Sequence, residues 1–119
     1  MPPDRRDPAH LWDLFKSAAA AVSALKDLPL DQYLGDENLR LVVERRLEIM
    51  GEAARRLSET FQEEHPEIPW RLIVAQRNFL IHQYDEIDHE RIWRLVREEL
   101  PPLLKQLEPL LPPAPERDS

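Results

Sequence analysis

Apolar residues recur every three to four positions along most of the chain, which is the spacing of an amphipathic α-helix. The first predicted helix begins at Asp7, which we expect to cap it, with Pro8 in the first helical position. Its apolar stripe runs to Leu25, and the connector over residues 27–36 has room for a short helical turn. The pattern therefore predicts one long helix at the start of the chain, followed by a short connection.

Three further helices are predicted by the same spacing. The stripe over residues 39–61 corresponds to a second helix of about six turns. A third helix is expected over residues 69–81, because a proline suits its first position. Asp88 is expected to cap a fourth helix, which Pro101 and Pro102 must kink or split because neither has an N–H to donate.

No stretch of the chain alternates polar and apolar residues in the way that a half-buried strand does. Two glycines and twelve prolines in 119 residues also favour helices over a sheet with many tight turns. We therefore expect an all-α fold, an antiparallel bundle of four to five helices, as a single domain over residues 1–119. The proline-rich ends, residues 1–7 and 112–119, are expected to be disordered tails.

The composition limits the functions that this chain can have. It contains no cysteine, which excludes disulfides and thiol chemistry, and no apolar run reaches the roughly 20 residues that span a bilayer. We expect a cytoplasmic protein without a membrane anchor. The formal charge of −7 argues against general binding to DNA or RNA, so any contact with phosphates must be local. Most of the cations are arginines, which bind phosphate and carboxylate with two hydrogen bonds.

The chemistry gathers in residues 74–88, with the sequence VAQRNFLIHQYDEID. Arg77 lies in the apolar stripe of the third helix, and His82 follows five positions later, about 140° around an ideal helix. The two side chains can share a face only if the helix ends or loosens between them. Asn78 adds an amide and Tyr84 a phenol. Because the 2′-hydroxyl of RNA is an internal nucleophile, His82 can transfer a proton while Arg77 stabilises the charge on phosphorus, without a metal.

Spacing alone also allows a purely structural interpretation of these residues. Arg77 can be a structural cation paired with Glu48 or Glu52 of the second helix, and His82 a residue at a helix end. A metal site built from His82, Asp85 and His89 is less favoured, since this spacing matches no strong ligand motif. We expect no metal and no cofactor.

A longer pattern resolves part of this ambiguity. Residues 51–107 resemble the HepT-type toxins of the HEPN superfamily, the partners of small MNT-type nucleotidyltransferase antitoxins. The most specific element is Arg-x-x-x-x-His-x-Tyr, filled here by Arg77, His82 and Tyr84, with Asn78 directly after the arginine. The flanking segments HPEIPW and YDEID strengthen the resemblance. Where family members often have glycine before the Arg-Asn pair, this chain has Ala75 and Gln76.

The resemblance implies a helical bundle that forms a homodimer, with the two motifs lining one cleft, and metal-independent endoribonuclease activity. Arg77 and His82 are then the catalytic residues. In this family the motif tyrosine, here Tyr84, can receive AMP groups from the antitoxin, which silences the toxin. A bulky anionic adduct two residues beyond His82 would obstruct the cleft and repel RNA phosphates. Further cationic candidates for the cleft, taken from the second and third helices, are Arg45, Arg46 and Arg71.

Two other interpretations remain open at this point. The chain can be a binding protein that holds nucleotides in the same cleft, or that serves as partner of a nucleotidyltransferase, without cleaving RNA. It can also be a helical dimer without a site, in which Arg77 contributes to stability alone. Loss of RNA cleavage on replacement of His82 would favour the enzyme over both.

Overall fold

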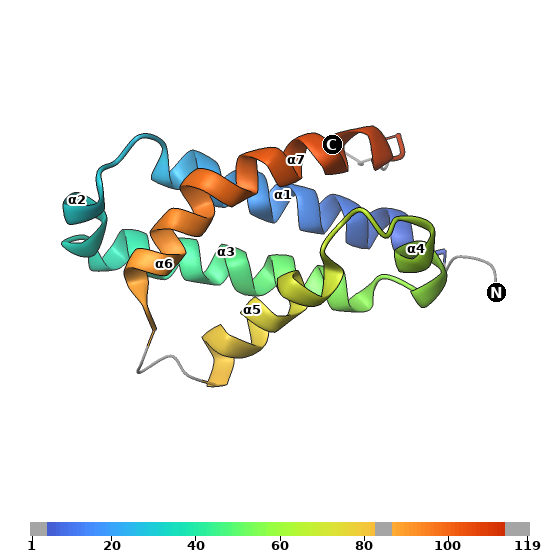
Figure 1. Cartoon of the computed structure of the whole chain (residues 1–119), viewed down its shortest axis with the longest axis horizontal. Helices are drawn as coiled ribbons and strands as arrows, with labels where there is room; N and C mark the ends of the chain where they lie inside the picture. Colours follow the sequence, from blue (N-terminus) through green and yellow to red (C-terminus); the bar gives the residue numbers. More distant parts are fainter. Residues whose placement is uncertain (1–4, 83–86, 114–119) are drawn as a thin grey trace, which may run out of the picture.

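The computed structural model describes residues 5–82 and 87–113, with residues 78–82 described by their backbone alone. These residues form helices and loops without a strand, so the predicted all-α class is confirmed (Figure 1). The elements are α1 (Asp7–Leu25), α2 (Leu30–Leu34), α3 (Glu37–Arg56), α4 (Glu59–Glu64), α5 (Trp70–His82), α6 (His89–Arg94), a π-helical turn η2 (Leu95–Glu99), α7 (Leu100–Leu107) and a 3₁₀ turn η3 (Glu108–Leu110). None of the helices in this part of the chain combines the length and apolarity needed to cross a membrane.

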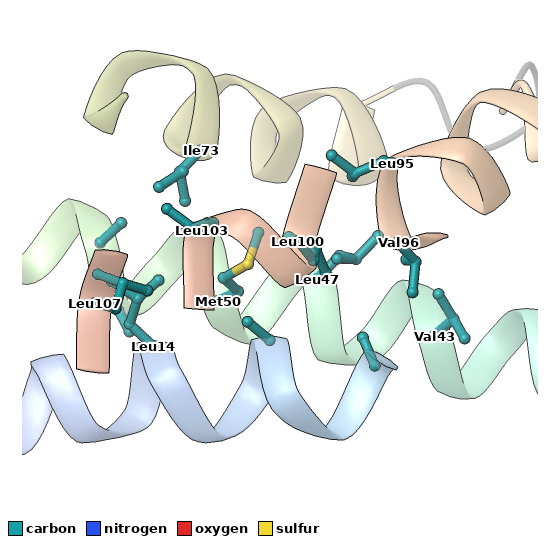
Figure 2. Packing of buried hydrophobic residues seen from close by; sticks show 14 of the residues in the cluster. Leu14, Val43, Leu47, Met50, Ile73, Leu95, Val96, Leu100, Leu103 and Leu107 are labelled. Atoms are coloured by element: carbon teal, nitrogen blue, oxygen red, sulfur yellow. The ribbon is translucent and has the colours of Figure 1, made fainter. Parts of the chain in front are cut away.

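Helix α3 is the centre of the bundle. It packs along α1 on one side and along α5 on another, while the fourth helix, made of α6, η2 and α7, packs against α1 through η2 and α7 and against α2 through α6 (Figure 1). Apolar side chains from all four of these layers meet in one buried core, as the labelled residues in Figure 2 show. Residues of this core include Leu14, Val43, Leu47, Met50, Ile73, Leu95, Val96, Leu100, Leu103 and Leu107.

The predicted second helix is wrong in one respect, because it does not continue to Phe61. It stops at Arg56, where Leu57 turns into extended backbone, and Ser58 starts the separate helix α4. The Ser58 hydroxyl accepts a hydrogen bond from the Phe61 backbone N–H at 3.1 Å and so caps α4. The chain therefore changes direction at Leu57 and Ser58, next to the start of α1 (Figure 1).

Asp7 makes this corner possible, and it does not cap α1 as predicted. Arg6 occupies the cap position of α1, while Asp7 is its first residue and is only 3% exposed. Its carboxylate accepts hydrogen bonds from the Ser58 backbone N–H at 2.9 Å and from the Ser58 hydroxyl at 2.6 Å. The Ser58 N–H, which has no helical acceptor because α3 ends before it, thus donates to a charged side chain 51 residues away in sequence.

The third helix, predicted over residues 69–81, agrees with α5 (Trp70–His82) to within one residue at each end, and the fourth helix begins where it was predicted. Asp88 caps the fourth helix by accepting a hydrogen bond from the Arg91 backbone N–H at 3.1 Å. Pro101 and Pro102 disturb that helix as predicted, since the carbonyls of Arg97 and Glu98 belong to the π-helical turn directly before them. A proline ring clashes with the carbonyl four residues earlier, and the wider turn moves both carbonyls away from the rings.

Replacement of Asp7 by alanine should destabilise the fold. The partly buried Ser58 N–H loses its acceptor, which corresponds to about 1–3 kcal/mol of unfolding free energy. Urea denaturation followed by circular dichroism measures the change. Asp13→Ala on the exposed side of α1 is the control and should remain within about 0.5 kcal/mol of the wild type. Equal stability of the Asp7 variant and the control would contradict this role of the carboxylate.

Candidate functional site

Arg77 lies where α5 comes closest to α3. A Cβ atom added to Gly51 of α3 would lie 2.3 Å from the Arg77 Cβ and 3.1 Å from the Ile73 carbonyl oxygen. No real side chain tolerates such contacts, so α5 occupies the space that any other residue would fill. Gly51 therefore fixes how closely Arg77 approaches the carboxylates of α3.

Glu52, the next residue of α3, holds Arg77. The Arg77 Nε atom lies 2.7 Å from Glu52 Oε2. The other oxygen, Oε1, lies 2.6 Å from Arg55 Nη2 and 3.0 Å from Arg56 Nε. One carboxylate thus orients three guanidinium groups, two from its own helix and one from α5. The predicted pairing of Arg77 with Glu52 is confirmed as a contact, whereas Glu48 lies 3.5 Å from Arg45 instead.

The electrostatic balance of this cluster is positive. Hydrogen bonds from Arg55 and then Arg56, with the charges of Arg55 and Arg77, lower the pKa of Glu52 from its ordinary value of 4.5 to about 2, although partial burial opposes the shift. Glu52 is consequently ionised at any physiological pH, and its single negative charge neutralises only part of the charge of three arginines. The cluster is a local site for an anion on a protein whose overall charge is negative.

Arg77 opens onto a pocket of about 420 Å³ between α1, α3 and α5. The charged and titratable residues that line it are His10, Asp13, Arg45, Glu48, Glu52, Arg56 and Arg77. The three arginines of this lining are matched by three carboxylates, those of Asp13, Glu48 and Glu52. The guanidinium groups can still bind phosphate oxygens one at a time, and the imidazole of His10 is a group that can transfer protons.

The other predicted site residues are placed only in part. Asn78 and His82 lie on α5, with His82 as the last residue of that helix, and the structure describes their backbone only. Tyr84 lies outside the described residues. Of the further cationic candidates, Arg45 lines the pocket, whereas Arg46 and Arg71 are exposed and do not. The structure therefore brings Arg77, Glu52, Glu48 and Arg45 together.

Sequence patterns did not identify Gly51, His10, Arg55 and Arg56 as site residues. Gly51 carried a signal, because it is an isolated glycine inside an amphipathic helix, where a close approach of another backbone is a common reason for it. Arg55 and Arg56 looked like ordinary solvated residues at a helix end. His10 carried no signal at all, since only the packing of α1 against α3 brings it to the pocket.

A second polar cluster lies near the start of α6. His89 Nδ1 is 3.3 Å from Glu44 Oε2, and burial raises the pKa of Glu44 although His89 and Arg40 oppose the shift. Burial, with the charge of Glu44, also raises the pKa of Tyr33. Among the residues that the structure describes, no group of three or more histidine, aspartate or glutamate side chains is arranged to hold a metal ion. His89 thus contacts a carboxylate of α3, and Asp85 lies outside the described residues.

Replacement of Gly51 by alanine should displace α5 and Arg77. The new methyl group overlaps the Arg77 Cβ, so the helices must separate, at a cost of about 1–3 kcal/mol of unfolding free energy. The matched control is Gly35→Ala, whose Cβ would meet its nearest atom at an ordinary 3.5 Å. Thermal or urea denaturation of both variants tests this, and a Gly51 variant as stable as the Gly35 variant would contradict it.

The Glu52 cluster should lose its contribution to stability only in strong acid. A carboxylate whose pKa falls on folding stabilises the folded state above its unfolded pKa, and this contribution is lost as the pH falls through the folded pKa. For Glu52 the loss runs from about pH 4.5 down to about pH 2. Urea denaturation of wild type and Glu52→Gln should therefore show a constant difference above pH 5 that shrinks below pH 4. A difference that already disappears between pH 7 and pH 5 would refute the assignment.

Comparison with known proteins places this chain in a family. The family model described as Ribonuclease HepT-like matches residues 15–110. The protein named "Putative RNase MJ1380" from Methanocaldococcus jannaschii is 37% identical over 100 residues, which cover 84% of this chain and 92% of that protein. "Probable ribonuclease HepT" from Thermococcus cleftensis is 33% identical over 101 residues, covering 85% of this chain and 92% of that protein. No solved structure matches the chain significantly. The family model covers most of the chain, and both relatives match over nearly their whole length, so the chain belongs to the HepT-like ribonuclease family.

Proposed function

We propose that this protein is an endoribonuclease that cleaves RNA at Arg77 and His82 without a metal ion, as the toxin of a toxin–antitoxin pair. The observation that carries the proposal is the fixed position of Arg77. Gly51 and Glu52 hold its guanidinium at a polar pocket that two further arginines line, in a chain that belongs to a ribonuclease family. An arginine that is oriented before the substrate arrives stabilises developing charge without reorganisation.

The chemistry needs only groups that the chain and the RNA supply. The 2′-oxygen attacks the adjacent phosphorus, a cyclic phosphate forms, and the bond to the 5′-oxygen breaks. His82 takes the proton from the 2′-hydroxyl or gives one to the departing 5′-oxygen. Arg77 stabilises the negative charge that builds up on the phosphoryl oxygens. Asn78 is proposed as a supporting residue that donates an amide hydrogen bond to the same phosphate.

The full reaction requires a second proton-transfer group. Positions 77 and 82 lie on one continuous helix, α5, and are separated by about 140° around its axis. This separation favours an arrangement in which Arg77 and His82 act on one phosphate from different protomers of a twofold dimer, where the partner copy also supplies the second histidine. His10 is the candidate within one protomer, because it lines the same pocket as Arg77.

Tyr84 is the proposed site of control. Transfer of AMP from an MNT-type nucleotidyltransferase antitoxin to its phenol would place a bulky anion two residues beyond His82. Such an adduct competes with RNA phosphates for the arginine cluster and repels them. The modified protein would then bind RNA more weakly than the unmodified protein does. The difference in affinity should be largest at low salt, where the interaction between charges is strongest.

RNA cleavage by purified, unmodified protein in excess chelator tests the proposed activity. We expect His82→Ala and Arg77→Ala to lower the rate roughly 10²–10⁴-fold, since each removes a group that acts in the transition state. His10→Ala should lower the rate to a similar degree only if His10, and not a partner's histidine, is the second proton-transfer group. Arg46→Ala, exposed and outside the pocket, is the control and should cleave as the wild type does.

Two results would argue against this function. Wild-type protein that leaves a broad RNA panel intact, while folded and dimeric, would favour a nucleotide- or partner-binding protein. Cleavage that persists in His82→Ala would move the proton transfer to another group. Circular dichroism of each variant separates a loss of chemistry from a loss of fold.

A further inference from the structure

We propose that a second pocket, on the other side of α5 from the arginine cluster, binds a nucleobase of the RNA substrate through Gln76. The inference rests on the proposed ribonuclease function and adds a specificity site to it. The pocket has a volume of about 450 Å³ and lies between α5 and the fourth helix. That volume is in the range of sites that enclose small organic ligands.

The floor of this pocket is apolar and its rim is polar. Met50, Ile73, Leu95, Leu100 and Leu103 line it, and Figure 2 shows these side chains converging on the space between α5, α3 and the fourth helix. All five are less than 9% exposed, whereas Arg91 and Glu99 at the rim are exposed. Flat apolar rings fit such a floor, and the sulfur of Met50 favours contact with an aromatic ring.

Gln76 adds a polar side-chain amide to this largely apolar pocket, and a purely apolar ligand would leave that amide without a hydrogen bond. Its Oε1 atom is buried and has no hydrogen-bond partner among the described residues, although the side chain lines this pocket. A buried carbonyl oxygen without a donor costs folding free energy, and such groups in native proteins usually have a ligand or a functional reason. The ligand that satisfies it must carry an N–H or O–H donor at the edge of an apolar body.

The fourth helix is irregular at the same place. Leu95 and Glu99 belong to the π-helical turn η2, and Pro102 lines the pocket one helical turn later. A π-helical turn is less favourable than an α-helical one and is frequent at functional sites. Pro102 and the π-helical turn together form part of this wall of the cavity.

A nucleobase meets these requirements better than other ligands of this size. Its ring faces are apolar, and its edge presents N–H donors beside acceptors, which a glutamine amide reads with two hydrogen bonds. Gln76 and Arg77 are consecutive on α5, one lining each pocket. A nucleotide lying across α5 would therefore place its phosphate at Arg77 and its base at Gln76. Arg91 at the rim can stack on the base from the open side.

Gln76→Leu separates this proposal from a structural role. Leucine keeps the size of the side chain and removes the unsatisfied oxygen, so the free energy of unfolding should stay equal or rise. Binding of single nucleosides, followed by the methyl NMR signals of Ile73, Leu95 and Leu103, should weaken roughly tenfold for at least one base. Gln32→Leu, the same change at an exposed position of α2, is the control and should alter neither quantity.

The titration with nucleosides requires no catalysis, so its failure is distinct from failure of the proposed function. If wild-type protein cleaves RNA, Gln76→Leu should also change the base preference beside the cleaved phosphate. The proposal is overturned if no nucleoside shifts the pocket signals at its solubility limit, or if cleavage by Gln76→Leu keeps the wild-type preference. The pocket signals can instead shift with protein concentration alone, and lose this dependence in Leu72→Asp, a change at the exposed rim. That result would show that a second copy of the chain occupies the pocket, and it would overturn the proposal as well.

Discussion

The close approach of α5 to α3 at Gly51 is the constraint on which the site depends. Without a Cβ atom at position 51, the backbone of α5 comes near enough for Arg77 Nε to reach the Glu52 carboxylate at 2.7 Å. The same crossing separates two cavities from each other, because Arg77 lines one and Gln76 lines the other. A helix pair at ordinary spacing, 8–10 Å between axes, would move the guanidinium away from its anchor. The glycine therefore determines electrostatics as well as packing.

The sequence predicted those features that local chemistry determines. The start of α1, the extent of α5 and the Asp88 cap follow from apolar spacing, prolines and a side chain that hydrogen-bonds its own neighbours. The break after Arg56 could not be predicted in this way, because the apolar pattern continues through Leu57 to Phe61. At this break the Asp7 carboxylate, 51 residues earlier in the chain, accepts the hydrogen bonds of Ser58. A tertiary hydrogen bond thus overrides a helical pattern, and only the folded structure reveals it.

The candidate site likewise contains residues that sequence patterns identified and residues that only the folded structure brings together. Arg77 was identified because an arginine in an apolar stripe is unusual, and Glu48 and Glu52 were both possible partners, of which the folded structure selects Glu52. His10 lies 67 residues before Arg77 and joins it only through the packing of α1 against α3. Likewise, Arg55 and Arg56 gain significance from a shared carboxylate, not from their own positions in the sequence. The periodic spacing of apolar residues describes single helices and not which helices meet. Sequence patterns can therefore identify site residues within one helix but not residues that come together from different helices.

The arginine cluster also explains how an acidic protein can attract RNA. Electrostatic attraction at long range is not available when the net charge is −7, since the overall field repels a polyanion and is screened beyond a Debye length of roughly 10 Å. Directly around Glu52 the balance is positive, because this carboxylate gathers three guanidinium groups and neutralises only one of their charges. Asp13 and Glu48, which line the adjoining pocket, restrict this positive region to the immediate surroundings of Arg77. Each guanidinium held in this way loses less conformational freedom when it binds phosphate than a free surface arginine does. Affinity is then confined to the place where a phosphate can meet Arg77, and the rest of the acidic surface opposes binding elsewhere along the strand.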